Sequence, residues 1–318
     1  MKGTLWLAWR QQRALVGCGA AVLVGVAALA AYFRSGMLDD LHSGLFDHCE
    51  PGPLFCSRPG DGLPLFLDIE PLKLLGALNI ALPTLIGMFW GAPLLGRDRE
   101  LGTHRMVLAQ GVSRAQWFAS RLALASAGTV ALSGSLALLF RWWWEPAANH
   151  GYGVFWYEAT ALTGSGPAAV AAALCGLAVG TLAGLLTRRV LSAMAWTLLL
   201  TAAVTALVQW THRARLLVPP HTYVSDGWRP KPPMGEKWST GHYGLITASG
   251  RREDVLNCPH PSGRELKECM TQHGYVARFY EANPAGDYWA FQWTDTALLG
   301  GLALALALVT VLLLRRRI

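Results

Sequence analysis

Long runs of hydrophobic residues, each about 20 residues long and almost free of charge, recur along the chain. About 20 helical residues cross the ~30 Å hydrocarbon core of a bilayer, whereas soluble helices are shorter and carry a polar face. The pattern therefore predicts an all-α polytopic membrane protein with about six transmembrane helices. The expected spans cover residues 14–33, 73–95, 121–141, 167–187, 190–210 and 294–314.

Composition agrees with this pattern. Of the 318 residues, 53% are hydrophobic and only 15% are charged, which is far from the average of soluble domains. The net charge of +7 does not indicate nucleic acid binding, because the basic residues stand in short groups beside apolar runs. They form no patch with interleaved aromatic residues. The expected surroundings are a lipid bilayer, with no nucleic acid partner.

The short basic segments predict which side each loop occupies. With six spans, four such segments fall on one side of the membrane, and by the positive-inside rule that side is the cytoplasm. Both termini are then cytoplasmic, in a bacterial cell (inner) membrane. The residues of these segments are Lys2, Arg10, Arg13, five arginines between positions 97 and 121, Arg188, Arg189, and Arg315 to Arg317.

The remaining segments are assigned to the extracytoplasmic side. Residues 34–72 hold seven acidic residues against two arginines, and residues 142–166 hold two acidic residues and no Lys or Arg. Residues 211–290 are too long to obey the rule, and their prolines indicate a small, loop-rich extracytoplasmic domain. Within the expected spans, charge is nearly missing; Asp295 is placed only at a span edge, which disfavours a proton-coupled carrier.

The expected division of the chain has four parts. Residues 1–13 form an amphipathic helix in the headgroup layer, with an early start of span one as the alternative. Residues 14–210 form spans one to five, residues 211–290 the outer domain, and residues 291–318 span six with a basic tail.

Four of the six cysteines fall in predicted outer loops, where disulfides persist. Four cysteines permit three pairings, and the local pairs Cys49–Cys56 and Cys258–Cys269 are favoured. Metal binding is the rival interpretation, since a histidine lies near one cysteine of each pair. Neither spacing matches a zinc ligand set, so no metal site is predicted.

Catalytic motifs are missing from the sequence. There is no G-x-x-x-x-G-K-[ST], so the chain has no phosphate-binding loop of its own, and neither H-E-x-x-H nor G-x-S-x-G occurs. No catalytic residue or bound cofactor is therefore predicted for this chain.

Residues 96–118 form a short, polar cytoplasmic loop of mixed charge, which by itself fits a solvated connector. Its pattern Arg99-Glu100-x-Gly102-Thr103-His104-Arg105, followed by Gln110 and Ser113-Arg114, resembles the loop after span two of type 2 ABC exporter permeases, especially actinobacterial ones. The segments at 9–13 (WRQQR) and 288–293 (YWAFQW) are similar to the same family.

The resemblance implies that this loop contains the coupling helix, which docks on a separate ABC ATP-binding subunit. ATP and Mg would then be bound by that subunit. The implied coupling residues are Glu100, Gly102, Thr103, Arg105, Gln110 and Arg114. Such exporters need two permease copies, so a second copy of this chain or a sibling chain is a further expected partner.

Gly176, Gly180 and Gly184 recur every four residues in span four and form one small-residue stripe. Such a stripe permits close helix approach. Packing within the chain and a dimer interface are both open uses of it.

Together these features predict an export permease that moves a lipophilic or amphipathic compound (a drug, antibiotic, lipid or peptide) outward. The alternatives are a membrane-anchored sensor that uses residues 211–290 as its receptor, and an intramembrane enzyme.

Overall fold

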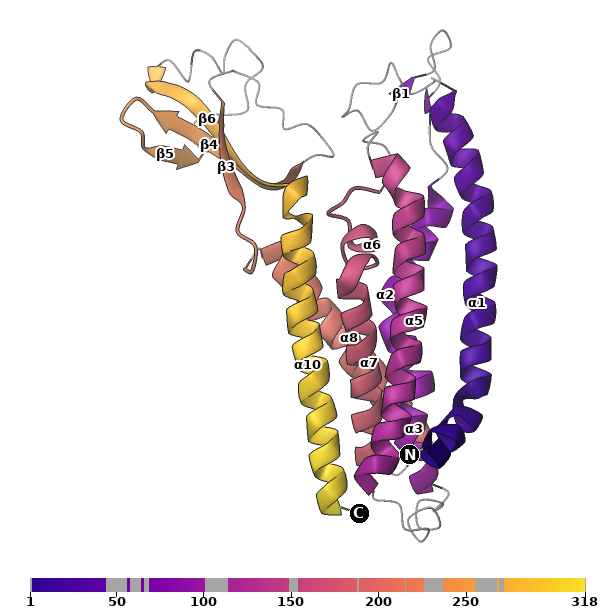
Figure 1. Cartoon of the computed structure of the whole chain (residues 1–318). Coiled ribbons are helices and arrows are strands. Elements are labelled where there is room, and N and C mark those ends of the chain that lie inside the picture. The colour runs from indigo at the N-terminus through magenta and orange to yellow at the C-terminus, as the bar shows by residue number, and fades with distance from the viewer. Residues whose placement is uncertain are drawn as a thin grey trace.

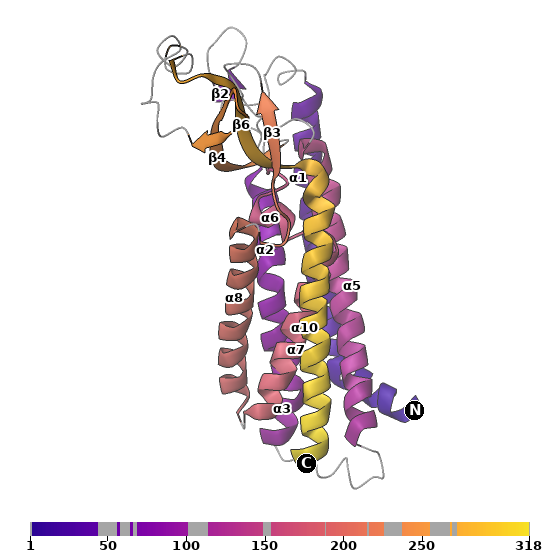
Figure 2. The ribbon, with the colours of Figure 1, turned by 90° about the vertical axis from the view of Figure 1, so that its left-hand side faces the viewer.

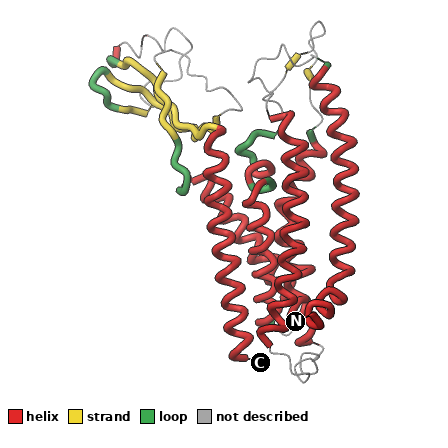
Figure 3. The backbone as a smooth tube through the Cα atoms, viewed as in Figure 1, coloured by secondary structure: helices red, strands yellow, loops and turns green. Residues whose placement is uncertain are grey.

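The computed structural model describes residues 2–43, 56–57, 64–65, 69–100, 114–148, 154–187, 189–214, 216–225, 237–254, 268 and 272–317. Within them, six helices are long and apolar enough to cross a membrane, which confirms the expected number of spans. They stand side by side as a bundle (Figure 1). Most of the described backbone is helical, and the strands are confined to one end (Figure 3). Their helical elements are α1 (Lys2–His42), α2 (Glu70–Ile86), η1 (Gly87–Gly91), α3 (Ala92–Glu100), α5 (Arg114–Ala148), α7 (Gly166–Leu186), α8 (Val190–Ala214) and α10 (Tyr288–Arg317).

Both chain termini lie at the same end of the bundle, and the strands lie beyond the other end (Figure 1). We call these the basal end and the sheet end. An even number of spans requires this arrangement of termini, and the expected assignment of the basal end to the cytoplasm stays a prediction. The connection between α7 and α8 is short and lies at the basal end, since α7 ends at Leu186 and α8 begins at Val190.

Helix α1 extends beyond the expected first span, 14–33, at both ends. It is one helix from Lys2 to His42, so it continues past residue 33 into the segment predicted to be an outer loop. The added turns carry Arg34, Asp39 and Asp40, of which the two acids are exposed and the arginine bonds the Trp142 carbonyl oxygen at 3.2 Å. The first turns bend away from the bundle axis (Figure 2). Their placement in the headgroup layer stays a prediction.

The second span is interrupted rather than straight. Pro83 lies inside α2, and the π-helical turn η1 follows directly, before α3 begins at Ala92. Proline lacks the N–H of a regular helix, and π-helical turns often mark the resulting irregularity. The second span therefore departs from regular α-helical geometry at this π-helical turn.

Helix α7 is the centre of the bundle and contacts α2, η1, α3, α5, α8 and α10. Its sequence is almost entirely small or apolar, so it has no polar face and is buried by neighbours all round. Helix α1, by contrast, packs mainly against α5. The core therefore lies along α7, with α1 and α8 at the periphery.

Residues 211–290 contain a four-stranded antiparallel sheet of order β3-β6-β4-β5, so the all-α fold class is wrong for this region, and the expectation of a loop-rich domain left the sheet out. Residues Tyr275, Ala277 and Phe279 alternate as buried positions, the period of a half-buried strand. The strands are β3 (His221–Ser225), β4 (Lys237–Thr247), β5 (Arg252–Asp254) and β6 (Tyr275–Pro284). A separate pair of antiparallel strands of two residues each, β1 (Cys56–Ser57) and β2 (Pro64–Leu65), lies in the first segment that was predicted to be extracytoplasmic.

The sheet is joined directly to the last span. Strand β6 ends at Pro284, the short helix η3 (Ala285–Asp287) follows, and α10 begins at the next residue. Asn283 is fully buried there and donates to the carbonyl oxygen of Pro219 at 3.3 Å and to the Asp287 carboxylate at 2.9 Å. With no loop between β6 and α10, movement of the helix carries the sheet with it.

Candidate functional site

The structure places the predicted coupling residues unequally. Glu100 ends α3 and Arg114 begins α5, so they flank the loop at the basal end. The side chain of Arg114 is not described. Gly102, Thr103, Arg105 and Gln110 lie outside the described residues, and their coupling role stays a prediction.

Glu100 connects the loop to helix α8. Its Oε2 accepts a hydrogen bond from the backbone N–H of Val190, the first residue of α8, at 3.1 Å. The first N–H groups of a helix have no partner inside the helix, and a carboxylate there is also favoured by the helix dipole. The start of the predicted coupling loop is therefore tied to the beginning of a membrane-spanning helix.

A buried polar network ties the two helices that flank the loop, α3 and α5, to α1. Arg121 of α5 is only 8% exposed; its Nη1 donates to the carbonyl oxygen of Leu94 in α3 at 3.0 Å, and its Nε to Oε1 of Gln11 in α1 at 3.0 Å. Gln12 donates to the Arg121 carbonyl oxygen at 3.2 Å and accepts from the indole N–H of Trp90 at 3.0 Å. Helices α1, α3 and α5 are thus joined at the basal end by charge-assisted bonds, the stronger kind.

Sequence reasoning missed the role of Arg121. It counted this arginine with the basic residues of a cytoplasmic segment, although the guanidinium also stacks over Trp117, 4.6 Å from the ring centroid. The WRQQR segment supplies both glutamines of the network. The signal available in the sequence was the presence of two glutamines in WRQQR, which can bond an arginine that is buried in the bundle.

The glycine stripe of α7 lies against the second span. A methyl group added at Gly176 would collide with the carbonyl oxygen of Pro83, one at Gly180 with that of Gly87, and one at Gly184 with that of Ala92. The facing atoms are backbone, so the two helices are in contact through their main chains. This face of α7 is occupied within the chain.

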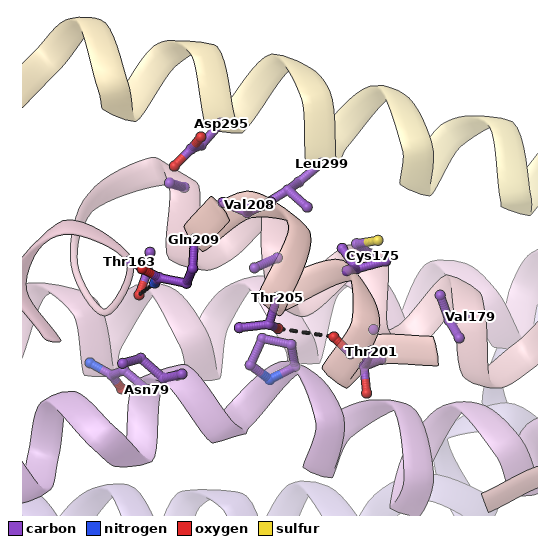
Figure 4. A pocket seen from close by; sticks show the side chains of 16 residues that line it. Asn79, Thr163, Cys175, Val179, Thr201, Thr205, Val208, Gln209, Asp295 and Leu299 are labelled. Carbon is purple, nitrogen blue, oxygen red and sulfur yellow. Dashed lines mark hydrogen bonds between the residues drawn. The ribbon is translucent and has the colours of Figure 1, made fainter. Parts of the chain in front are cut away.

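A pocket lies between α2, α7, α8 and α10 (Figure 4). Its cavity volume is about 40 Å³, which gives room for a water-sized group in this conformation. Apolar side chains form most of its wall. Its polar residues are Asn79, Thr163, Thr201, Thr205, Gln209 and Asp295.

Asp295 and His212 form a buried pair that sequence reasoning misplaced. The carboxylate was assigned to a span edge, but its side chain is 2% exposed and lies 2.9 Å from Nε2 of His212, which is 3% exposed. Helix α8 continues past residue 210 to Ala214, which places the histidine inside the bundle. The pair joins α8 to α10 near the sheet end.

An aromatic cluster lies where the sheet meets the bundle. Trp238 of β4 stacks on Tyr157, with ring centroids 5.8 Å apart, and contacts Phe291 of α10 at 5.8 Å. Trp156 packs edge-on against Trp238 at 6.2 Å. Burial, and secondarily the charge of Glu158, raises the pKa of Tyr157 above its ordinary value.

The predicted disulfides cannot be compared with the structure. Cys49, Cys258 and Cys269 lie outside the described residues, and Cys56 belongs to β1 with its side chain not described. Among the described cysteines, Cys18 and Cys175 are free thiols within α1 and α7.

Comparison with known proteins gives one family match. The model of the family described as "ABC-2 membrane transporter related" matches residues 20–213, more than half of the chain. No curated protein and no solved structure matches the chain. The match begins within the first span, runs through the fifth and includes the residues on both sides of the predicted coupling loop. The chain is therefore a multi-pass membrane protein that belongs to the ABC-2 membrane transporter related family.

Proposed function

We propose that this chain is the permease of an exporter that is powered by a separate ATP-binding subunit. The family supports a transporter permease, and the outward direction, the partner and the substrate class are parts of the proposal. The basal end faces the cytoplasm of a bacterial inner membrane, and the transported compound is lipophilic or amphipathic. Two permease copies, each with an ATP-binding subunit that holds ATP and Mg²⁺, form the complete exporter.

The observation that carries this proposal is the connection of the loop at 101–113 to the spans. On one side, Glu100 accepts a hydrogen bond from the first N–H of α8. The second half of that helix, from Thr201 to Gln209, lines the pocket. On the other side, Arg121 fixes α5 to α1 and α3. A push on the loop by an ATP-binding subunit therefore reaches the pocket through hydrogen-bonded rigid helices, which is the coupling between sites that transport requires.

Substitution of Arg121 tests the proposal. The chain is co-expressed with its candidate ATP-binding subunit, purified in lipid nanodiscs, and assayed for complex formation and ATP hydrolysis. Arg121→Lys keeps the charge but loses the planar fork that bonds Leu94 and Gln11 together. We expect the complex to form. The permease should then no longer change the rate at which the ATP-binding subunit hydrolyses ATP.

Arg141→Lys is the matched control, because Arg141 lies at the other end of α5 and is 5.2 Å from the ring of Trp289. This variant should hydrolyse ATP as the wild type does. The proposal is wrong if the folded chain binds no ATP-binding subunit, or if Arg121→Lys and Arg141→Lys behave alike.

A further inference from the structure

The hydroxyl groups of the pocket share one property: each already donates its proton to a backbone carbonyl oxygen. On α8, Thr201 donates to the carbonyl oxygen of Thr197 at 2.7 Å, and Thr205 to that of Thr201 at 3.0 Å. The amide N–H of Gln209 faces the Thr163 hydroxyl oxygen at 3.4 Å, and that hydroxyl donates to the Ala159 carbonyl oxygen at 2.6 Å. Because Thr201 donates to Thr197, it accepts from the Thr84 hydroxyl at 2.9 Å, and what the three hydroxyl oxygens still present to the pocket is their remaining lone pairs.

Asn79 on the opposite wall adds an acceptor without a partner. Its Nδ2 donates to the carbonyl oxygens of Gly164 at 2.7 Å and Leu136 at 3.4 Å. Because carbonyl oxygens only accept, these two bonds fix the orientation of the amide group. The side chain is 4% exposed, and within the described part of the chain its Oδ1 has no hydrogen-bond partner. A buried acceptor left in this state is costly unless a donor reaches it.

The pair at the sheet end of the pocket adds the carboxylate of Asp295. Nε2 of His212 faces the Asp295 carboxylate, while Nδ1 is buried and has no partner among the described residues. The carboxylate of Asp295 is thus held by the His212 ring at the wall of the pocket.

We propose that this pocket binds the protonated primary amine of an amphipathic molecule. An ammonium group has three N–H donors, no acceptor and a positive charge, which complements acceptors beside a carboxylate. It is also close to water in size, as the narrow space requires. Val179, Val208 and Leu299 line the same pocket and suit the adjoining alkyl carbons (Figure 4). This inference rests on the proposed transport function and names the substrate class of the same pocket.

The test uses the purified full-length chain alone, in nanodiscs of a zwitterionic lipid, so its outcome is independent of any ATP-binding subunit. The probe is n-octylammonium, titrated by calorimetry against octyltrimethylammonium, which lacks N–H donors, and n-octanol, which lacks charge. Asp295→Asn removes the carboxylate of the pocket. Asp39→Asn removes an equal charge from the exposed end of α1 and controls for partition into the lipid.

We expect octylammonium to bind the wild type and Asp39→Asn equally, and Asp295→Asn at least about tenfold more weakly. The two comparison probes should bind all three proteins weakly. If Asp295→Asn does not fold, Gln209→Met keeps the side-chain volume and removes one acceptor, with an expected loss of about threefold.

Equal binding of octylammonium and octanol, or unchanged binding by the pocket variant, would overturn the proposal. Competition by Na⁺ at the same concentration would overturn it as well, because the site would then be one for an inorganic cation. A chain that binds octylammonium as expected but activates no ATP-binding subunit would contradict the proposed function and leave the amine site standing.

Discussion

Replacement of Gly180 by alanine is expected to destabilise the bundle, although alanine is the better helix former. The added methyl group would collide with the carbonyl oxygen of Gly87 and lie 3.0 Å from the backbone nitrogen of Ala92. Because both neighbours are backbone, no side-chain rotation relieves the contact, and α7 must move away from η1. Overpacking of this kind costs about 1–3 kcal/mol.

Gly301→Ala is the matched control. Gly301 lies in α10, is exposed, and has nothing within 4 Å of an added methyl group. Both substitutions gain the same helix propensity, about 0.5–1 kcal/mol over glycine. The difference between the two variants therefore isolates the collision, and Gly180→Ala should be about 1–3 kcal/mol less stable than Gly301→Ala.

Reversible unfolding in mixed micelles with increasing sodium dodecyl sulfate, followed by circular dichroism, measures the two free energies of unfolding. Equal free energies for the two variants would refute the main-chain contact between α7 and the second span. Equal values would also reopen the glycine stripe for a second copy of the chain, because its face would then not be closed within the chain.

Three further predictions follow from single contacts. Glu100→Ala removes the acceptor at the start of α8 and should cost about 0.5–2 kcal/mol, with faster amide exchange confined to the first turn of that helix. His212→Phe should cost about 3–5 kcal/mol because it leaves the buried Asp295 carboxylate without its partner, and the double substitution His212→Phe/Asp295→Asn should cost less than the sum of the two single changes, as a double-mutant cycle would show. Since burial raises the pKa of Tyr157, the unfolded chain loses this proton first, so stability should fall as pH rises above 10.0, and Tyr157→Phe should lessen that fall in alkaline unfolding curves.

The hydrophobic pattern was sufficient to predict the six spans, because burial in a bilayer acts on whole segments of about 20 residues. The sheet was missed for the opposite reason. Strands β4 and β6 are held by pairing between distant residues such as Tyr243 and Tyr280, and many prolines surround them in sequence. Pairing at that separation leaves only a faint local pattern.

The polar contacts could not be predicted because they depend on which helices are neighbours. Arg121 and Asp295 both stand near the ends of apolar runs, where charged side chains ordinarily reach the interface. Their burial follows from the partners Gln11 and His212, which lie 110 and 83 residues away in the sequence. Hydropathy therefore predicts the number of helices. The tertiary contacts decide which polar residues are buried between those helices.

The basal and sheet ends should respond together when the loop at 101–113 is displaced. Helix α8 is held at its start by Glu100 and near its end by the His212–Asp295 pair, and α10 continues into β6 without a loop. Trapping the ATP-bound form of the complex should therefore change amide exchange in residues 275–290 as well as in residues 94–100. A change confined to the basal residues would contradict this path, since α8 would then move without carrying α10 and the sheet.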